Sequence, residues 1–192
     1  MRQNIRYILK YIITPLFSLI LLWFSYLYIY GNIHQVNRDL YRSAQLYQFN
    51  MPYYFTKYHI RTVINLRGSA PQKQWYQSEI RFCKEHNITH IDFGISDRKV
   101  VDISTMHRLV ALMQKAKKPL LVHCKAGADR TSLASALYRY AIEHDVGAYK
   151  QISFKYGHFP YLGSPTVAMD KSFNIYVQHF PLKETDVSSK IR

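Results

Sequence analysis

The stretch of residues 120–131 constrains this chain more than any other part of its sequence. It reads Leu-Leu-Val-His-Cys-Lys-Ala-Gly-Ala-Asp-Arg-Thr, so a short apolar run leads into a loop with a central glycine. The apolar run predicts a buried strand, and the apolar stripe after residue 130 predicts a helix. A tight loop between a strand and a helix aims several backbone N–H groups at one point, and the helix N-terminus adds positive potential there. We therefore expect a loop that binds an anion of the size of phosphate.

The residue types in this loop suit covalent phosphate chemistry. Cys124 stands at the mouth of the loop, where a helix N-terminus and nearby cations stabilise a nucleophilic thiolate. Arg130 closes the loop, and its planar guanidinium can bind two phosphate oxygens at once. We expect Thr131 to donate a hydrogen bond to the thiolate and His123 to order the loop through its ring nitrogens. The backbone of the loop is expected to hold the phosphate, through Lys125, Ala126, Gly127, Ala128, Asp129 and Arg130. The alternative is a buried cysteine in an ordinary strand-to-helix turn.

With His before the cysteine, Gly in the middle and Thr after the arginine, the motif resembles that of the cysteine-dependent protein tyrosine and dual-specificity phosphatase superfamily. The stretches Leu40–Gln45 and Thr62–Arg67 are similar to the opening of compact bacterial members of this superfamily, and several of those members are envelope proteins. With these stretches and the loop, the resemblance covers about residues 38–145. The stretch Lys155–Phe159 is similar to the tail of one bacterial subgroup. The resemblance implies a phosphocysteine intermediate, a metal-free reaction without a cofactor, and an upstream aspartate as general acid.

Two residues depart from the pattern of these relatives. Ser132 stands where many relatives have glycine, and Asp129 places a negative charge beside the phosphate loop. We expect the Asp129 side chain to point outward, and the charge leaves the substrate preference open.

Three aspartates lie between the second predicted strand and the next predicted helix. Asp92 alternates with apolar neighbours and is expected in the strand, while Asp102 precedes Ile103 and is expected to cap the helix. Asp97 falls in a polar loop, from which a mobile carboxyl group could reach a leaving oxygen, so we assign it as the general acid. The alternatives are Asp102 and an acid other than these two residues. Arg67 either lines the pocket or holds that loop by a salt bridge, or else it is a surface arginine at the end of a strand.

The N-terminal segment is strongly apolar. Residues 11–30 carry no formal charge, and 20 helical residues span about 30 Å, which matches a bilayer core. We expect a transmembrane anchor over residues 11–31; the alternatives are a cleaved signal peptide and a buried core helix. The basic residues before it, Arg2, Arg6 and Lys10, place the N-terminus in the cytoplasm. The expected location is a bacterial inner membrane, spanned once, with the catalytic domain in the periplasm.

The charge and the cysteine count restrict the partners and the class of protein. A net charge of +14 favours anionic partners: phosphoproteins, anionic phospholipids or the membrane surface. The charge is scattered and no nucleic-acid-binding motif is present, so nucleic acid is not expected. Two cysteines exclude a disulfide scaffold, and Cys83 is expected to be a small buried residue of a helix.

Strands and helices alternate along the chain, which predicts an α/β fold: a three-layer sandwich with a small, largely parallel central sheet flanked by helices, after one transmembrane helix. The expected strands are 62–66, 88–93 and 119–123, and the expected helices are 52–58, 72–86, 103–117, 129–144 and 166–180. The expected division is a cytoplasmic N-terminus at 1–10, the anchor at 11–31, a phosphatase domain at 32–182 and a polar tail at 183–192.

The sequence leads to three functional hypotheses. The first is a protein tyrosine or dual-specificity phosphatase that works through phosphocysteine. The second is a membrane phospholipid phosphatase acting on a substrate such as phosphatidylglycerophosphate, which the predicted anchor, the net charge and Lys125 favour. The third is a non-catalytic phosphate-binding module, against which the combination of Cys124, Arg130 and Asp97 argues.

Overall fold

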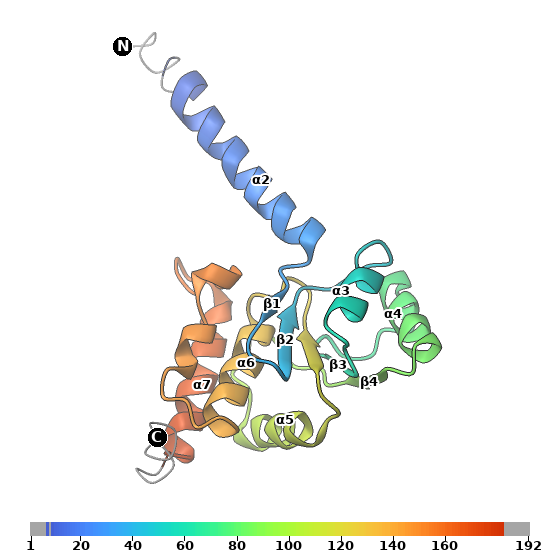
Figure 1. Ribbon diagram of the computed structural model, residues 1–192. Helices are drawn as coiled ribbons and strands as arrows, with labels where there is room; N and C mark the ends of the chain where they lie inside the picture. The colour runs from blue at the N-terminus through green and yellow to red at the C-terminus, as the bar shows by residue number, and fades with distance from the viewer. Residues whose placement is uncertain (1–6, 8, 183–192) are drawn as a thin grey trace.

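The computed structural model describes residue 7 and residues 9–182. Most of the predicted N-terminus at 1–10 and the whole polar tail at 183–192 lie outside the described residues. The described chain forms a five-stranded sheet in the order β1-β2-β5-β3-β4, with helices packed against it (Figure 1). The strands are β1 (His34–Gln35), β2 (Leu40–Ser43), β3 (Thr62–Asn65), β4 (Thr89–Asp92) and β5 (Leu120–His123).

The sheet is mixed, because β1 is antiparallel to β2 while the other four strands run parallel. The central strand β5 pairs with β2 on one side and with β3 on the other, so Val122 lies opposite both Arg42 and Ile64. Parallel strands end at one edge of a sheet, and this register brings the ends of β2, β3 and β5 together. The α/β fold with a small, largely parallel sheet is confirmed.

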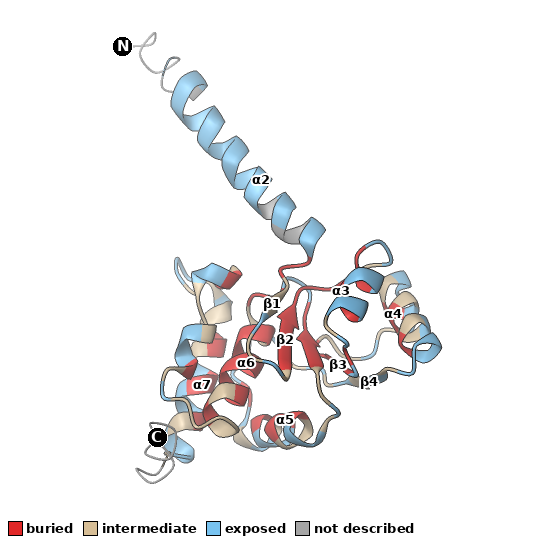
Figure 2. Cartoon of the chain, viewed as in Figure 1, coloured by how far each residue is buried: buried red, intermediate tan, exposed pale blue. Residues whose placement is uncertain are grey.

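Helices cover both faces of the sheet. They are α3 (Met51–Lys57), α4 (Gln74–Glu85), α5 (Ile103–Lys115), α6 (Arg130–Ala141) and α7 (Ala168–His179). Alternate residues of β5 enter two separate hydrophobic clusters: Leu120 and Val122 pack with α5, α6 and α7, whereas Leu121 packs with α3 and α4. Figure 2 shows this pattern as a buried sheet centre with exposed outer helix faces. Successive side chains of a strand point to opposite faces of the sheet, so β5 contributes to a hydrophobic cluster on each side.

The predicted elements agree closely with the observed ones, and β2 is the main addition. The predicted strands correspond to β3, β4 and β5, and the predicted helices correspond to α3–α7, with ends shifted by a few residues. Short 3₁₀ turns at Ala148–Gln151, Phe154–Tyr156 and Pro165–Val167 connect α6 to α7. Cys83 is buried in α4, as predicted, and burial raises the pKa of its thiol to about 12. It belongs to the cluster on the other side of the sheet from Cys124, and both thiols are free.

The apolar N-terminal segment does not form the predicted transmembrane anchor. A π-helical turn at Leu9–Ile13 precedes α2 (Thr14–Tyr30), and the chain turns at Gly31, so the α-helix has 17 residues and projects away from the sheet (Figure 1). Seventeen residues span about 26 Å, less than the roughly 30 Å of a bilayer core. Across the described residues, no helix combines the length and apolar character needed to span a membrane. The predicted anchor at 11–31 is therefore wrong, and so is the single-pass inner-membrane location inferred from it. The count of uncharged residues overestimated the helix, because it included residues 11–13, which belong to the π-helical turn.

Candidate active site

The loop of residues 124–129 connects the C-terminal end of β5 to the first turn of α6. Gly127 adopts a φ of +71°, and a Cβ atom built there would lie 2.6 Å from the backbone nitrogen of Ala44. Only glycine fits such a close approach at this backbone angle without strain. The turn that folds the loop back over the end of β2 therefore depends on this residue.

The carbonyl groups of the loop are held from its outer side. The Lys125 carbonyl accepts a hydrogen bond from the Gln45 backbone N–H at 3.2 Å, and the Ala126 carbonyl accepts one from the Asn32 side chain at 3.0 Å. The Gly127 carbonyl accepts one from the Arg42 guanidinium at 3.0 Å. In a trans peptide the N–H points opposite to the C=O. Three successive peptide N–H groups therefore point to the inner side of the loop, where they can bind an anion.

Cys124 and Arg130 lie at the two ends of this loop. The Cys124 side chain is 2 % exposed, and the Arg130 guanidinium donates to the Leu66 carbonyl across the loop at 3.4 Å. Asp97, in the segment between β4 and α5, lies 3.5 Å from the Arg130 guanidinium. The three residues assigned to catalysis from the sequence thus come from two separate segments that meet at the C-terminal edge of the sheet.

Arg42 is a buried cation on the outer side of the loop that the sequence analysis did not assign. It is fully buried in β2, and its guanidinium stacks 3.7 Å from the centre of the Tyr156 ring. Besides Gly127, it donates to the Ser132 hydroxyl at 2.7 Å and to the Gln151 carbonyl at 2.9 Å. Burial lowers its pKa to about 10. The hydroxyl of Ser132 thus has a definite role, because it accepts from Arg42 where a glycine would offer no side chain.

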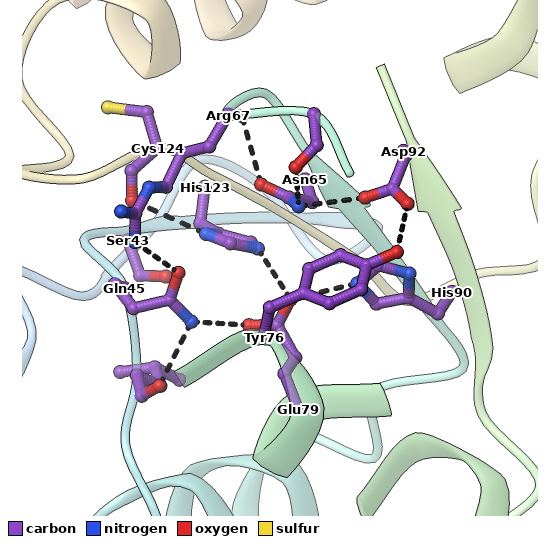
Figure 3. A network of polar contacts seen from close by, with 12 residues as sticks. Ser43, Gln45, Asn65, Arg67, Tyr76, Glu79, His90, Asp92, His123 and Cys124 are labelled. Atoms are coloured by element: carbon purple, nitrogen blue, oxygen red, sulfur yellow. Dashed lines mark hydrogen bonds and ion pairs between the residues drawn. The ribbon is translucent and has the colours of Figure 1, made fainter. Parts of the chain in front are cut away.

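A second polar network holds the strand end before Cys124 (Figure 3). The His123 ring contacts the Cys124 carbonyl at 3.3 Å through Nδ1 and the Glu79 carboxylate at 3.2 Å through Nε2. The same Glu79 oxygen contacts Nε2 of His90 at 2.8 Å, while the other accepts from the Gln45 side chain at 2.6 Å. Burial opposes ionisation of Glu79, but the two histidines outweigh it and lower its pKa to about 2. His123 is therefore fixed from both ring nitrogens.

Arg67 lies at the end of this network. Its guanidinium donates to the Gln45 side chain at 3.0 Å (Figure 3). The same group stacks 3.5 Å from the centre of the Trp75 ring. A chain of contacts thus runs from Arg67 through Gln45 and Glu79 to His123. Arg67 is half-buried at the edge of the site, and a salt bridge to Asp97 is not among its contacts in the described structure.

The remaining candidate residues take structural positions. Asp92 ends β4 and binds the Asn65 amide and the Tyr76 hydroxyl, as expected of a strand residue. Asp102 caps α5, where its carboxylate accepts from the Thr105 N–H at 2.8 Å. Thr131 is buried in α6, and its hydroxyl donates to the Ser43 carbonyl at 3.4 Å. Within the described part of the chain, histidine, cysteine and carboxylate groups do not converge in threes that could hold a metal ion.

The sequence comparisons assign this arrangement to a family. The model of the tyrosine phosphatase family matches residues 30–151, more than half of the 192-residue chain. This chain belongs to the tyrosine phosphatase family. The matched region contains the whole anion loop and the residues that brace it from β2 and α4.

Solved structures of other phosphatases share the fold of this phosphatase. The crystal structure of TpbA from P. aeruginosa is 18 % identical and superposes with a TM-score of 0.59, covering 82 % of this chain and 90 % of that one. A Cys-to-Ser variant of TpbA in complex with pTyr is also 18 % identical, with a TM-score of 0.58 over 76 % of this chain and 90 % of that one. PTPMT1 in complex with PI(5)P is 15 % identical, with a TM-score of 0.55 over 77 % of this chain and 97 % of that one.

Sequence reasoning missed the buried charges that brace the phosphatase loop, although Glu79 left a signal. Tyr76, Glu79 and Cys83 follow the i, i+3, i+7 spacing of one helix face, and all three are buried. A carboxylate on an otherwise apolar stripe needs a buried partner. Arg42 left a weaker signal, because a single arginine in a short strand is ordinarily at the surface.

Proposed function

We propose that this phosphatase hydrolyses phosphomonoesters through a phosphocysteine intermediate, as a protein tyrosine or dual-specificity phosphatase. The single observation that carries the proposal is the position of Cys124 at the entrance of a loop in which three successive carbonyls, those of residues 125–127, are bound from the outside. The inward N–H groups and Arg130 match the three equatorial oxygens of a phosphoryl group under attack. The complex of TpbA with pTyr supports a phosphotyrosine substrate. We place the catalytic domain in residues 32–182.

The reaction proceeds in two steps. The Cys124 thiolate attacks phosphorus, an S–P bond forms and the P–O bond to the leaving group breaks, while Asp97 gives its proton to the leaving oxygen. Water then attacks the phosphocysteine, Asp97 takes a proton from that water, and the S–P bond breaks to release inorganic phosphate and the thiolate. The distance of 3.5 Å between the Asp97 carboxylate and the Arg130 guanidinium supports this assignment of the acid.

Replacing the nucleophile tests this proposal. Cys124→Ser should abolish turnover of p-nitrophenyl phosphate and of a phosphotyrosine peptide, because no base in the proposed mechanism activates a serine hydroxyl. Binding of inorganic phosphate, measured by calorimetry, should survive, since the N–H groups and Arg130 remain. Wild-type activity should withstand EDTA. Measurable turnover by Cys124→Ser would contradict the thiolate mechanism, and phosphate binding by a wild-type protein without turnover would favour a non-catalytic phosphate-binding module.

A lipid phosphomonoester is the second candidate substrate, and an apolar groove beside the loop favours it. The groove has a volume of about 530 Å³ and is lined by residues of α2, by Ala44 and by the loop, among them Leu21, Ile29, Lys125 and Ala128. An acyl chain could lie along α2 while its phosphate occupies the loop and Lys125 neutralises part of its charge. The complex of PTPMT1 with PI(5)P supports this alternative.

The two substrate classes can be separated with variants of α2. If a lipid chain occupies the groove, Leu21→Asp should lower kcat/KM for a short-chain phosphatidylglycerophosphate and leave turnover of a phosphotyrosine peptide unchanged. Leu22→Asp is a matched control, because Leu22 is exposed on the same helix and does not line the groove. Equal activity of both variants on the lipid would argue against the groove as a lipid site.

A further inference from the structure

The Asp129 carboxylate is bound away from the anion loop by a buried histidine. Asp129 directly precedes Arg130, and its Oδ1 lies 2.7 Å from Nδ1 of His158. The opposite ring nitrogen of His158 lies 2.9 Å from the Asp170 carboxylate of α7. The His158 side chain is 1 % exposed. His158 and Asp170 lie beyond the region that matches the tyrosine phosphatase family, which ends at residue 151.

The geometry of this group favours a protonated ring. Ionised carboxylates only accept hydrogen bonds, so a contact with an ionised carboxylate on each side of His158 requires a proton on both ring nitrogens, as in an imidazolium. Burial lowers the pKa of His158, but the hydrogen bonds and charges of Asp129 and Asp170 outweigh it and raise the pKa above its usual 6.5. These two carboxylates, one from the loop and one from α7, are the charged groups in contact with the ring.

The segment that carries His158 is fixed to the loop by other contacts as well. The Tyr156 ring lies under Arg42, and the Asn32 side chain donates both to the Tyr156 carbonyl and to the Ala126 carbonyl of the loop. Gly157 has a φ of +87° and faces the side chain of Ala128. The position of residues 156–158 against the loop therefore does not depend on the His158 ring alone.

We propose that His158 is a positioning residue of the anion loop: its imidazolium holds the Asp129 carboxylate outside the loop and offsets part of its negative charge. The proposal rests on the proposed function only in taking phosphate as the anion that the loop binds. Without the imidazolium, the carboxylate next to Arg130 would repel the phosphate dianion and compete for the guanidinium. Within a few ångströms and at a partly buried site, one uncovered charge changes anion affinity by roughly 10- to 100-fold.

A double-variant experiment on the full chain tests the charge relation. His158→Gln should raise the dissociation constant of inorganic phosphate, and the KM for p-nitrophenyl phosphate, by about 10- to 100-fold. Adding Asp129→Asn should restore most of that affinity, because the repelling charge is then absent. His179→Gln is the matched control, since His179 is exposed on the same helix as Asp170, and it should leave phosphate binding unchanged. Unaltered binding in His158→Gln, or a loss that Asp129→Asn does not reverse, would overturn the proposal.

A second variant keeps the inference testable if His158→Gln fails to fold. Asp170→Asn leaves the contact between His158 and Asp129 in place but removes one of the two charges that stabilise the imidazolium. Phosphate affinity should decrease at alkaline pH, where His158 loses its proton, and in Asp170→Asn this decrease should occur at lower pH than in the wild type. Coincident plots of phosphate affinity against pH for the two proteins would contradict the inference. Calorimetry measures phosphate binding without any turnover. A wild-type protein that binds phosphate but does not hydrolyse esters would therefore refute the proposed function and leave the proposed role of His158 standing.

Discussion

Two arginines and two aspartates surround the anion loop, and their contacts give them different roles. Arg130 reaches across the loop to the Leu66 carbonyl and to Asp97, whereas Arg42 is fully buried behind the loop and donates to its carbonyl at Gly127. Asp97 is partly exposed and paired with Arg130, while Asp129 is bound to His158. The charge of a residue does not by itself predict its role here, because burial and orientation decide whether the side chain faces the anion site or the protein interior.

The leaving-group dependence of Asp97→Asn would identify the general acid. We expect kcat to fall by about 10²- to 10⁴-fold for phosphoserine or an alkyl phosphate, whose alkoxide must be protonated as it leaves. The loss should be small for p-nitrophenyl phosphate, whose phenolate leaves unaided. Steady-state kinetics on both substrates measure the difference. An equal loss on both would show that Asp97 only orients Arg130, to which it is paired at 3.5 Å.

At the scale of elements, the sheet explains how much the sequence could predict. Strands β3 and β5 read as apolar runs, so their existence and position followed from pattern alone. Strand β2 was missed because Arg42 and Ser43 interrupt its apolar character, although all four of its residues are buried. The partners that stabilise the Arg42 guanidinium in the interior, Gln151 and Ser132, are about 90 to 110 residues away along the chain. Local patterns contain no information on such contacts.

Gly127→Ala should disrupt the loop. The added Cβ would lie 2.6 Å from the Ala44 nitrogen and 2.7 Å from the Ser43 carbonyl carbon, and a φ of +71° is unfavourable for alanine. Left-handed strain and the overlap together predict a loss of about 2–4 kcal/mol in the free energy of unfolding. Denaturant unfolding measures it, and phosphate binding should fall in parallel. Gly163→Ala, at a similar positive φ but with open space around it, is the control for strain without overlap. A Gly127→Ala protein with wild-type stability would contradict this account of the turn.

Asp102→Ala should affect the α5 helix and leave catalysis intact. Asp102 is the N-cap, accepting from Thr105 N–H at 2.8 Å and from the Ser104 hydroxyl at 2.6 Å, and these bonds lower its pKa well below the usual range. Losing the cap frees a backbone donor at the helix end, so Tm should fall by a few degrees. We expect kcat/KM for p-nitrophenyl phosphate and for an alkyl phosphate to change less than about twofold, because Asp97 and not Asp102 is the proposed acid. A leaving-group dependence in this variant would instead make Asp102 the acid.

For the whole molecule, the site is a meeting point of segments that are distant in sequence. The loop follows β5, Arg42 comes from β2, Glu79 from α4, and Asp97 from the segment after β4. The sequence motif identified the loop because its residues are contiguous. The apolar segment at the N-terminus was misjudged for a related reason: its composition indicated hydrophobicity but not where the helix would begin and end, and the observed α2 is bounded by a π-helical turn and by Gly31.

The buried Glu79 network should make the stability of the molecule depend on pH in the acid range. The pKa of Glu79 is lowered from 4.5 to about 2, so the folded state binds this proton more weakly than the unfolded chain does. The ionised carboxylate therefore stabilises the fold fully above pH 4.5, and this contribution is lost as pH falls toward 2. The difference between the two pKa values corresponds to about 3 kcal/mol.

Urea unfolding of the wild type and of Glu79→Gln between pH 7 and 2.5 measures this contribution. The advantage of the wild type should shrink as pH falls below 4.5, since glutamine does not titrate and the other carboxylates titrate equally in both proteins. Glu79→Gln should also lower kcat, because His123 loses the charged partner that fixes its ring against the Cys124 carbonyl. Parallel stability curves for the two proteins down to pH 2.5 would mean that Glu79 is not held ionised by His90 and His123.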